Sequence, residues 1–582
     1  MKQFVYNHKQ ALLTLLFGIA VFIFWRIGYP QALSFSEELQ LFLFDADYVS
    51  HFFTYPGGIA VGLGAFIGQF YASLTVGALI LAFISVLLQR LTWLMARTEG
   101  ASDNSYPLTF ITPIALLHIM SDENILLPLP ISISIALGVC LLWVHIQTDT
   151  QQYIVALILT PLLFWSIGIG AYIFVVYVSY RYIRYKKLYF SNIIKIATLL
   201  ILLCTSVVVS YRISHYTIAR VAAGAINFYR FKTAFVPAIA LFALLSVILP
   251  CFLFLSEKIK KYRWATTTTY LLPIALLIIA TTTNYTDRKY IIMRYDMLMR
   301  NHNWEGIIAL AEQTEPVTPL EVYSVNFALA MQGQLPDRMF TFPQHSPQGL
   351  VPTFKREISY SLMANEVYFA LGMVNTSQRF VFEAQEAIPN EQKSGRIMRR
   401  LAETNLILGH YDVAERYLRI LQKTFAYSRW ANEMMTYLGN ENKIDAHPFY
   451  GKLRSKIVGT DFFYSDSEVD QMLGMLFVHN NSNTLALNYL LCYELLKCDI
   501  KHFEKYYPLT AKIPNYKVIP RAYQEALAYI WSANHNSFNG IPWAISEPVK
   551  NNFIECVNAY RNHRDLNTNN LKNTYWRYLL SK

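Results

Sequence analysis

The residues best suited to chemistry lie between Gly28 and Gly58, an acidic and aromatic stretch between two apolar runs, called here the first loop. Within it, Asp45 and Asp47 are separated by one alanine, and Glu38 precedes them. A carboxylate can act as a base toward a hydroxyl group, and paired carboxylates can hold a divalent cation. We therefore select these three acids as candidate catalytic residues, with a divalent metal as the cofactor if the protein is an enzyme.

The same acids also have a plain structural interpretation. The two aspartates can be solvated side chains that end a helix in the membrane interface. Ser36 followed by Glu37 and Glu38 is a good helix start, because a serine caps a helix and acids favour the positive end of its dipole. The next run, Leu39–Phe44, is apolar nearly all round, so the sequence predicts a short interfacial helix there.

Two further groups of charged residues are expected on the same side of the membrane as the first loop. Asp122 and Glu123 occupy a short turn between apolar runs and are candidate metal ligands, but acids can also simply keep a tight turn in water. The loop Arg212–Lys232 is unusually basic for an outer loop, and it contains Arg212, His215, Arg220 and Arg230. Basic residues in such a loop can also only contact phospholipid headgroups.

The sequence lacks the short motifs of the common enzyme classes. It contains no nucleophile elbow, phosphate-binding loop, pair of zinc ligands or dinucleotide fingerprint. Of its six cysteines, three lie in apolar runs and an odd number remains, so they indicate neither a disulfide framework nor a metal cluster. The candidate acids must therefore be judged by the elements that position them.

The composition indicates that part of the chain lies in lipid. Hydrophobic residues make up 54% of the chain and charged residues 15%, whereas soluble domains carry about a quarter charged residues. Long apolar runs are confined to residues 11–283, and residues 284–582 have the mixed periodicity of water-soluble helices. We therefore predict a transmembrane domain over residues 1–283 and a soluble domain over residues 284–582.

The net charge of +11 does not indicate a nucleic acid partner. Many basic residues lie beside apolar runs, as in Arg181–Lys187 and Lys258–Arg263. Lysine and arginine accumulate in short cytoplasmic loops, so we interpret these residues as signals that set the orientation of the helices in the membrane. If Lys2 and Lys9 lie in the cytoplasm, the first apolar helix crosses the membrane and ends on the extracytoplasmic side. We therefore expect the first loop to be extracytoplasmic.

We expect nine membrane spans in the first domain. The segment Gly58–Tyr71 is short for a crossing and is expected to be re-entrant or interfacial. The run Tyr153–Tyr180 is either one tilted helix or two short crossings divided near Gly168 and Gly170, and only the second arrangement returns the following basic residues to the cytoplasm. With that hairpin, the spans cover residues 11–27, 72–95, 106–120, 125–146, both halves of 153–180, 192–211, 233–255 and 264–283. Residues 284–582 then lie outside the cytoplasm.

The spacing of apolar residues in 284–582 predicts helical hairpins. In Leu401–Lys423, Gly409 permits a tight turn and the small Ala414 lets paired helices approach, while Tyr411 and Tyr417 complete a tetratricopeptide-like pattern. Because no clean 34-residue period is present, we predict an all-α protein whose second half is an irregular α-solenoid. Such surfaces usually bind peptides or proteins, although the domain can instead only cap the membrane part.

Several segments resemble an uncharacterised family of bacterial envelope membrane proteins. They are FSEELQLFLFDADY and YPGG in the first loop, Asn326–Phe340, Glu366–Pro389 and the terminal Thr574–Leu580. The resemblance covers nearly the whole chain and implies a polytopic half followed by a helical-repeat tail. It implies a multi-pass protein of the bacterial inner membrane with a periplasmic C-terminal domain, and it implies no activity.

The topology is also similar to that of integral-membrane glycosyltransferases of the GT-C type, which use lipid-phosphate-linked sugars. Those enzymes carry an acid in the first outer loop and often more in a later one, as Asp45, Asp47, Asp122 and Glu123 do here. The resemblance implies that a carboxylate acts as base and that paired acids hold a cation against the phosphate. It implies that a polyprenyl-phosphate carrier is gripped by Arg212, His215, Arg220 and Arg230. The chain departs from these enzymes in having fewer spans, and a D-x-D pair has low specificity.

Three function classes follow from these features. An enzyme would transfer a sugar from a lipid carrier while the solenoid engages the acceptor, and a scaffold would use the solenoid to assemble envelope proteins. A transporter would carry charged residues deep in its spans, yet the apolar runs are nearly free of them. We therefore expect a membrane glycosyltransferase or a membrane scaffold, which alanine substitution of Asp45 and Asp47 separates.

Overall fold

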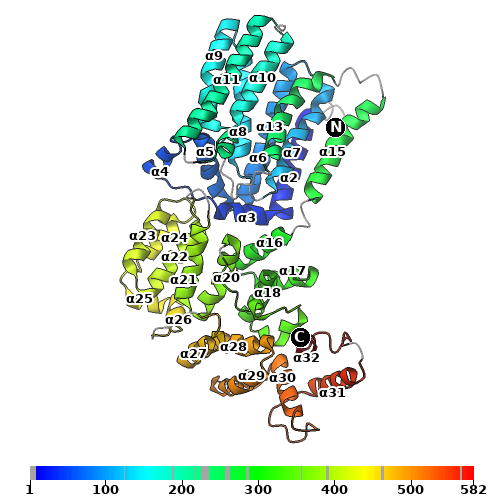
Figure 1. The fold of residues 1–582 in the computed structure, drawn as a ribbon, viewed down its shortest axis with the longest axis vertical. Helices are drawn as coiled ribbons and strands as arrows, with labels where there is room; N and C mark the ends of the chain where they lie inside the picture. Colours follow the sequence, from blue (N-terminus) through cyan, green and yellow to red (C-terminus); the bar gives the residue numbers. More distant parts are fainter. Residues whose placement is uncertain are drawn as a thin grey trace. The chain divides into compact units, whose positions relative to one another are not determined.

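All regular secondary structure in the part of the chain that the structure describes is helical (Figure 1). The computed structural model describes residues 8–122, 125–185, 189–214, 216–224, 235–255, 263–283, 288–355, 357–388, 392–459, 465–514, 516–563 and 566–582. Within these residues there is no β-strand. The prediction of an all-α protein is confirmed.

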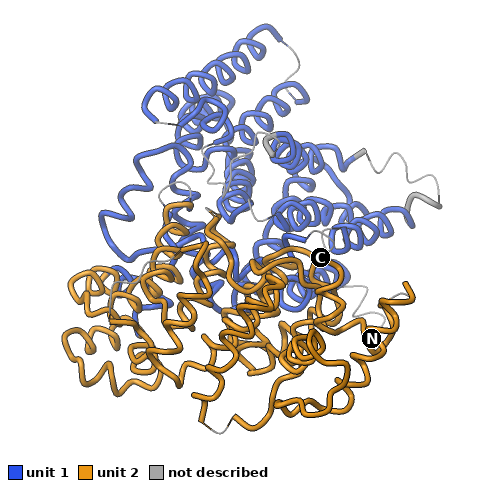
Figure 2. Tube along the Cα trace, turned by 60° about the horizontal axis from the view of Figure 1, so that its bottom comes forward, with its two compact units in different colours: residues 1–290, 388–395, 420–429 blue, residues 291–387, 396–419, 430–582 orange. Residues whose placement is uncertain are grey.

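The chain divides into two compact units (Figure 2). Unit 1 comprises residues 1–290 with the short segments 388–395 and 420–429, and unit 2 comprises residues 291–387, 396–419 and 430–582. Residue 284, where we expected the domain border, lies outside the described residues. The segments 388–395 and 420–429 belong to unit 1, although in the sequence they lie between parts of unit 2.

Four helices among the described residues are long and apolar enough to cross a membrane. They are α2 with its π-helical extension η1 (Lys9–Gly28), α6 (Leu74–Thr98), α9 (Asp149–Ile167) and α11 (Phe190–Ile213). The other expected spans fall on η3 (Asp103–Phe110) with α7 (Ile111–Met120), α8 (Pro128–Val144), α10 (Gly170–Tyr185), α13 (Phe235–Phe252) and α15 (Arg263–Thr282). The nine-span topology therefore stays a prediction.

Helix α6 packs against α2, α7, α8 and α13. Its buried residues recur every three or four positions, which is the spacing of one wide helix face: Gly77, Ala78, Leu81, Ala82, Ile84, Ser85, Leu88, Gln89, Thr92 and Trp93. Leu79 and Phe83 are exposed, as expected of side chains that face lipid. Inside the bundle, the Gln89 amide donates a hydrogen bond to the Thr109 hydroxyl at 2.8 Å.

Three chain segments meet in unit 1 at Gly57, Gly168 and Gly224. All three glycines have positive φ, which is costly for residues with a side chain. A Cβ atom on Gly57 would stand 2.5 Å from the Gly224 carbonyl oxygen, and a Cβ on Gly168 would collide with the same atom. Gly168 also separates α9 from α10, so the predicted break near Gly168 and Gly170 is confirmed.

The first loop folds differently from the prediction. Helix α3 (Pro30–Glu38) ends at the serine and glutamates that were expected to begin a helix, and Leu39–Phe44 is not helical. The predicted start at Ser36 is wrong because Pro30 occupies the first turn of α3, where its fixed φ favours a helix that begins earlier. Leu39, Leu41 and Phe42 are buried in the protein instead of lying in a membrane interface. The short helix α4 (Ala46–His51) follows, and α5 (Gly58–Gly68) begins after it.

Unit 2 is built from helices that pair with their neighbours along the chain. The pairs are α17 (Trp304–Gln313) with α18 (Pro319–Met331), α20 (Ile358–Leu371) with α21 (Val374–Glu386), α25 (Glu441–Ala446) with α26 (Tyr450–Arg454), α27 (Val469–His479) with α28 (Thr484–Lys497), and α30 (Arg521–Ser532) with α31 (Glu547–Arg561). Gly409 has φ 79° between α22 (Gly395–Leu408) and α23 (Tyr411–Gln422), and Ala414 is buried, as predicted. A solenoid stays a prediction.

One hydrophobic core joins both ends of unit 2. It extends from Tyr295 on α16 (Arg288–Arg300) to Tyr578 on α32 (Tyr575–Leu580). The Trp576 indole donates a hydrogen bond to the Glu525 carbonyl at 2.8 Å, and the Tyr578 hydroxyl donates one to the Leu496 carbonyl at 2.8 Å. The terminal segment that carries part of the family resemblance is therefore a packing element.

Glu525 is expected to make unit 2 less stable as the pH rises. Its carboxylate accepts hydrogen bonds from the Tyr575 amide at 2.7 Å and from Arg521 at 2.9 Å. Burial raises the pKa of Glu525 from 4.5 to about 7 against the lowering effect of these two partners. Its contribution to stability is therefore fully present below pH 4.5 and is lost as the pH rises through about 7.

The expected loss is on the order of 1–3 kcal/mol. It is measured as the difference in free energy of unfolding of the full-length protein between about pH 4.5 and about pH 7.5. Glu525→Gln removes the titrating group and should reduce this difference. An equal difference in the variant and the wild type would contradict the assignment.

Candidate functional site

Asp45 is held in place by two structural interactions. Its carboxylate caps α4 by accepting hydrogen bonds from the amides of Asp47, at 3.1 Å, and Tyr48, at 3.3 Å. It also forms an ion pair with Lys423, which lies in the segment 420–429 of unit 1, and the Phe44 amide donates to the Lys423 carbonyl at 2.7 Å. The hydrogen bond from Lys423 lowers the pKa of Asp45, so this acid is anionic and neutralised by a neighbour.

Asp47 lies in a different environment. It occupies the first turn of α4, and its side chain is exposed. Its backbone carbonyl accepts a hydrogen bond from the Ser50 hydroxyl at 2.8 Å, but no described residue donates a hydrogen bond to its carboxylate. Among the predicted catalytic acids, Asp47 is the most exposed, since the Asp45 side chain is 25% exposed and Glu38 is buried.

The glutamates of α3 are buried. Glu37 is 4% exposed and Glu38 is 2% exposed. The Tyr427 hydroxyl, also in the segment 420–429, donates a hydrogen bond to Glu37 at 3.0 Å. Glu38 therefore does not share the exposed surface of Asp47, and the structure does not present these two predicted acids as a pair.

Asp122 also has a counter-charge. Lys289 lies 3.4 Å from its carboxylate, and the neighbouring Tyr290 hydroxyl donates to the Ser121 carbonyl at 2.7 Å. Tyr29 donates to the same carbonyl at 3.1 Å, so this turn is tied to the start of the first loop. Glu123, the second predicted metal ligand, lies outside the described residues.

The basic loop is described in part. Arg212 ends α11 and is exposed, and Arg220 lies half-buried on α12 (Ile218–Ala222) with its guanidinium 4.4 Å from the Tyr216 ring centre. Burial lowers the pKa of Arg220. His215 and Arg230 lie outside the described residues.

The structure brings the first loop beside α12. Gly57 approaches Gly224 closely, and the pKa of Tyr55 is raised first by burial and then by the nearby Tyr216. An apolar cavity of about 340 Å³ lies next to α12 and is lined by α10, α12 and α13. Its lining includes Tyr172, Val176, Ala222, Ala243 and Val247, and none of the predicted acids. The predicted acids therefore do not line this cavity.

A more strongly built polar cluster was missed by the sequence analysis. Glu99, at the end of α6, has a fully buried side chain that accepts hydrogen bonds from Tyr177 at 2.8 Å and Tyr185 at 2.9 Å. Arg181 and Arg184 lie 2.8 Å and 3.4 Å from the same carboxylate. The basic run that we interpreted as an orientation signal therefore also joins α10 to α6.

The comparisons with known proteins identify a family and no activity. No curated protein and no solved structure matches the chain. A family model described as a family of unknown function (DUF6057) matches residues 5–582. Residues of all the segments that resemble bacterial envelope proteins lie within that match, and the prediction of an uncharacterised family is confirmed. The chain belongs to this family of unknown function, DUF6057.

Proposed function

We propose that the protein is a membrane-anchored scaffold of the bacterial envelope, whose second half binds protein or peptide partners. The observation that carries this proposal is the use of the outer acids within the fold. Asp45 is paired with Lys423, Asp122 with Lys289, and Glu37 with Tyr427. Carboxylates engaged in this way support the structure and leave little charge for catalysis.

The helical pairs of unit 2 supply the binding surface in this proposal. All of these pairs except α25 with α26 bury apolar side chains in one common core. Several large apolar side chains are nevertheless exposed, including Met475 and Val478 on α27 and Val518 before α30. Exposed apolar side chains on a helical surface are the kind of contact that a partner chain covers.

A glycosyltransferase that uses a lipid-phosphate-linked sugar is the second candidate. It is favoured by the exposed carboxylate of Asp47 and by Arg220 on the short helix beside the apolar cavity. In this proposal the cavity takes part of a polyprenyl chain, the arginine contacts its phosphate, and Asp47 acts as base. A divalent cation at the outer acids would be the cofactor, and the helical second half would engage the acceptor.

The proposed location is the inner membrane, with the N-terminus in the cytoplasm and the second half in the periplasm. Basic residues cluster at Lys9, Arg90, Arg97 and Arg181–Lys187, which nine spans place on one side. Nine spans then put residues 284–582 on the other side.

Asp47→Asn separates the two candidate functions. The scaffold proposal expects this variant to be indistinguishable from wild type, because the carboxylate touches no described side chain. The glycosyltransferase proposal expects a loss of roughly 10²–10⁴-fold in release of polyprenyl phosphate from a polyprenyl-phosphate-linked sugar, as removal of a general base would cause. The assay uses membranes that contain the full-length protein.

Asp45→Asn is the matched variant, since it lies on the same helix but has structural partners. It should weaken the contact with Lys423 and lower thermal stability while Asp47→Asn does not. Photo-crosslinking from Met475 and Val478 tests the scaffold directly, and it should give one discrete adduct in wild type and Asp47→Asn alike. Release of polyprenyl phosphate that requires Asp47 would overturn the scaffold proposal.

A further inference from the structure

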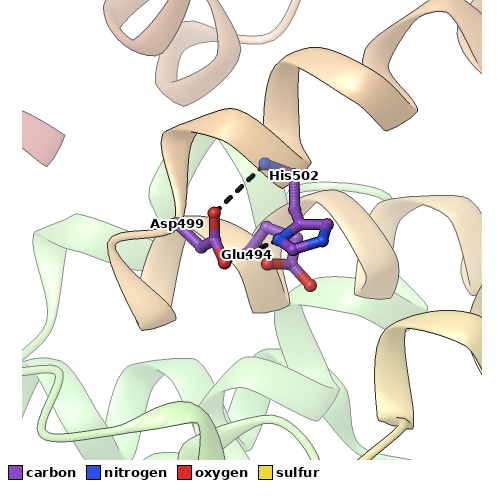
Figure 3. Close-up of side chains that lie close together, drawn as sticks. All are labelled: Glu494, Asp499 and His502. Carbon is purple, nitrogen blue, oxygen red and sulfur yellow. Dashed lines mark hydrogen bonds and ion pairs between the residues drawn. The ribbon is translucent and has the colours of Figure 1, made fainter.

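We propose that Glu494, Asp499 and His502 of unit 2 form a binding site for a divalent transition-metal ion. Each residue offers one donor atom, and the three atoms lie within 4.8 Å of one another. Figure 3 shows the three side chains converging where α28 ends and α29 (Ile500–Tyr506) begins. This site is separate from the outer acids of unit 1 and does not depend on either candidate function.

The turn between the two helices positions the donors. Cys498 follows α28 with φ 58°, and this left-handed residue redirects the chain so that Asp499 caps α29. The Asp499 carboxylate accepts a hydrogen bond from the His502 amide at 3.1 Å and lies 2.7 Å from the His502 ring nitrogen Nδ1. That 2.7 Å contact is a hydrogen bond, whereas neighbouring ligands of one tetrahedral Zn²⁺ ion stand ~3.3–3.6 Å apart, given metal–ligand distances of ~2.0–2.2 Å. A bound ion would replace this hydrogen bond, and the two donor atoms would move apart by less than about 1 Å.

Glu494 supplies an independent indication of a ligand. Its side chain is fully buried, and its Oε1 atom has no hydrogen-bond partner among the described residues. A buried oxygen without a donor costs free energy, because it has lost water and gained nothing in exchange. A metal ion shared with Asp499 and His502 would satisfy this oxygen.

The surrounding charges favour a cation. Lys497 lies 3.5 Å from Glu494 and 3.8 Å from Asp499, and its side chain is 36% exposed, so it can move into solvent when an ion binds. Asp470 on α27 adds a third negative charge near Glu494 and accepts a hydrogen bond from Tyr506 at 2.8 Å. The site also lies at the C-terminal end of α28, where the helix dipole favours positive charge.

The donor set identifies the class of metal. One imidazole with two carboxylates suits Zn²⁺ or Mn²⁺, whereas all-oxygen sites suit Mg²⁺ or Ca²⁺. The His502 side chain is 44% exposed, so water can complete the coordination. Glu494 lies in the last turn of α28, Asp499 caps α29 and His502 lies in the first turn of α29, so a bound ion would join these two helices.

The test is a calorimetric titration of Zn²⁺ into the full-length protein in detergent after removal of metal with a chelator. Wild type should bind one ion at a saturable site, and His502→Gln and Glu494→Gln should each weaken binding by about tenfold or more, as loss of one ligand does. Lys497→Gln should bind more tightly, because it removes the cation that competes with the metal. His479→Gln is the matched control, since His479 is an exposed histidine on the adjacent α27, and it should bind as wild type does.

Thermal unfolding keeps the test decisive if Glu494→Gln fails to fold. Zn²⁺ should raise the unfolding temperature of wild type and of His479→Gln, and it should not raise that of His502→Gln. We expect His502→Gln to fold, because the His502 side chain is 44% exposed. Absence of saturable binding to wild type would overturn the proposal. So would an affinity in His502→Gln equal to wild type, or a loss in His479→Gln as large as that in His502→Gln.

Discussion

Replacing Glu366 with glutamine is expected to destabilise unit 2 by about 3–5 kcal/mol. Glu366 on α20 lies 2.9 Å from Arg400 and 3.7 Å from Arg396, and the side chains of all three residues are between 11% and 16% exposed. Burial raises the pKa of Glu366, but the two arginines outweigh this effect and hold the pKa below its usual range. The neutral variant would leave two buried guanidinium groups without their shared counter-charge.

The remaining contacts of these arginines do not replace Glu366. Arg396 is also bound by Asp296 through two hydrogen bonds of 2.9 Å, and Arg400 contacts Glu403 at 3.3 Å. Glu403 is shared with Arg399, which lies 3.1 Å from it, whereas Glu366 is the acid that contacts both Arg396 and Arg400. Removal of its charge therefore breaks the ion pairs between α20 and α22, while Asp296 still joins α16 to α22.

Hydrogen exchange of the full-length protein measures this effect locally. Peptides from α20 and α22 should exchange faster in Glu366→Gln than in wild type. Glu312→Gln is the matched control, because Glu312 forms a single ion pair with Arg338 at 2.8 Å while 57% exposed. Exposed pairs contribute about 0–1 kcal/mol, so equal effects of the two variants would contradict the prediction. The contribution of Glu366 is present at neutral pH and is lost as the pH falls through its lowered pKa.

Replacing Glu99 with glutamine is expected to have an effect of similar size, about 3–5 kcal/mol, in unit 1. The Glu99 side chain is fully buried and accepts from two tyrosine hydroxyls and two arginines. Arg184 also donates to the Glu99 carbonyl at 3.3 Å and to the Cys251 carbonyl at 3.3 Å, which extends the cluster to α13. A glutamine can accept at only one of its two side-chain positions, so part of this cluster would lose its acceptor.

Asp103→Asn is the matched control for Glu99→Gln. Asp103 lies 2.7 Å from Arg97, close to Glu99 in sequence, but its side chain is 69% exposed. The unfolding temperature measured in detergent should be much lower for Glu99→Gln than for wild type, and it should change little for Asp103→Asn. If Glu99→Gln were as stable as Asp103→Asn, the hydrogen bonds and ion pairs of Glu99 would not stabilise unit 1 as predicted.

Local features could be predicted from the sequence, and long-range partners could not. Gly168 and Gly409 were identified as turn positions because glycine is the residue that adopts positive φ without cost. The partners of the candidate acids, Lys423 for Asp45 and Lys289 for Asp122, lie far along the chain and carry no local signal. The charge of a lysine alone did not indicate which of the many lysines would lie close to Asp45 or to Asp122.

The errors near the first loop have a common physical cause. The sequence Ser36-Glu37-Glu38 fits a helix start when only its neighbours are considered, but Pro30 starts a helix earlier, and the run after that helix is buried and not helical. The ion pairs of Arg181 and Arg184 with Glu99 were likewise not predicted, because the pattern of cytoplasmic loop residues says nothing about such partners. Tertiary packing decided both cases, and a periodicity argument contains no information about it.

The meeting of Gly57, Gly168 and Gly224 sets an order for biogenesis. The turn at Gly57 closes against the backbone of Gly224, which the ribosome synthesises much later. At ~5–20 residues per second, the interval is roughly 10–30 s. Lys423, which pairs with Asp45, is synthesised later still. The first loop is thus among the earliest parts of the chain to leave the ribosome and among the last to reach its final form, so its contacts with Gly224 and Lys423 stay unmade in the meantime.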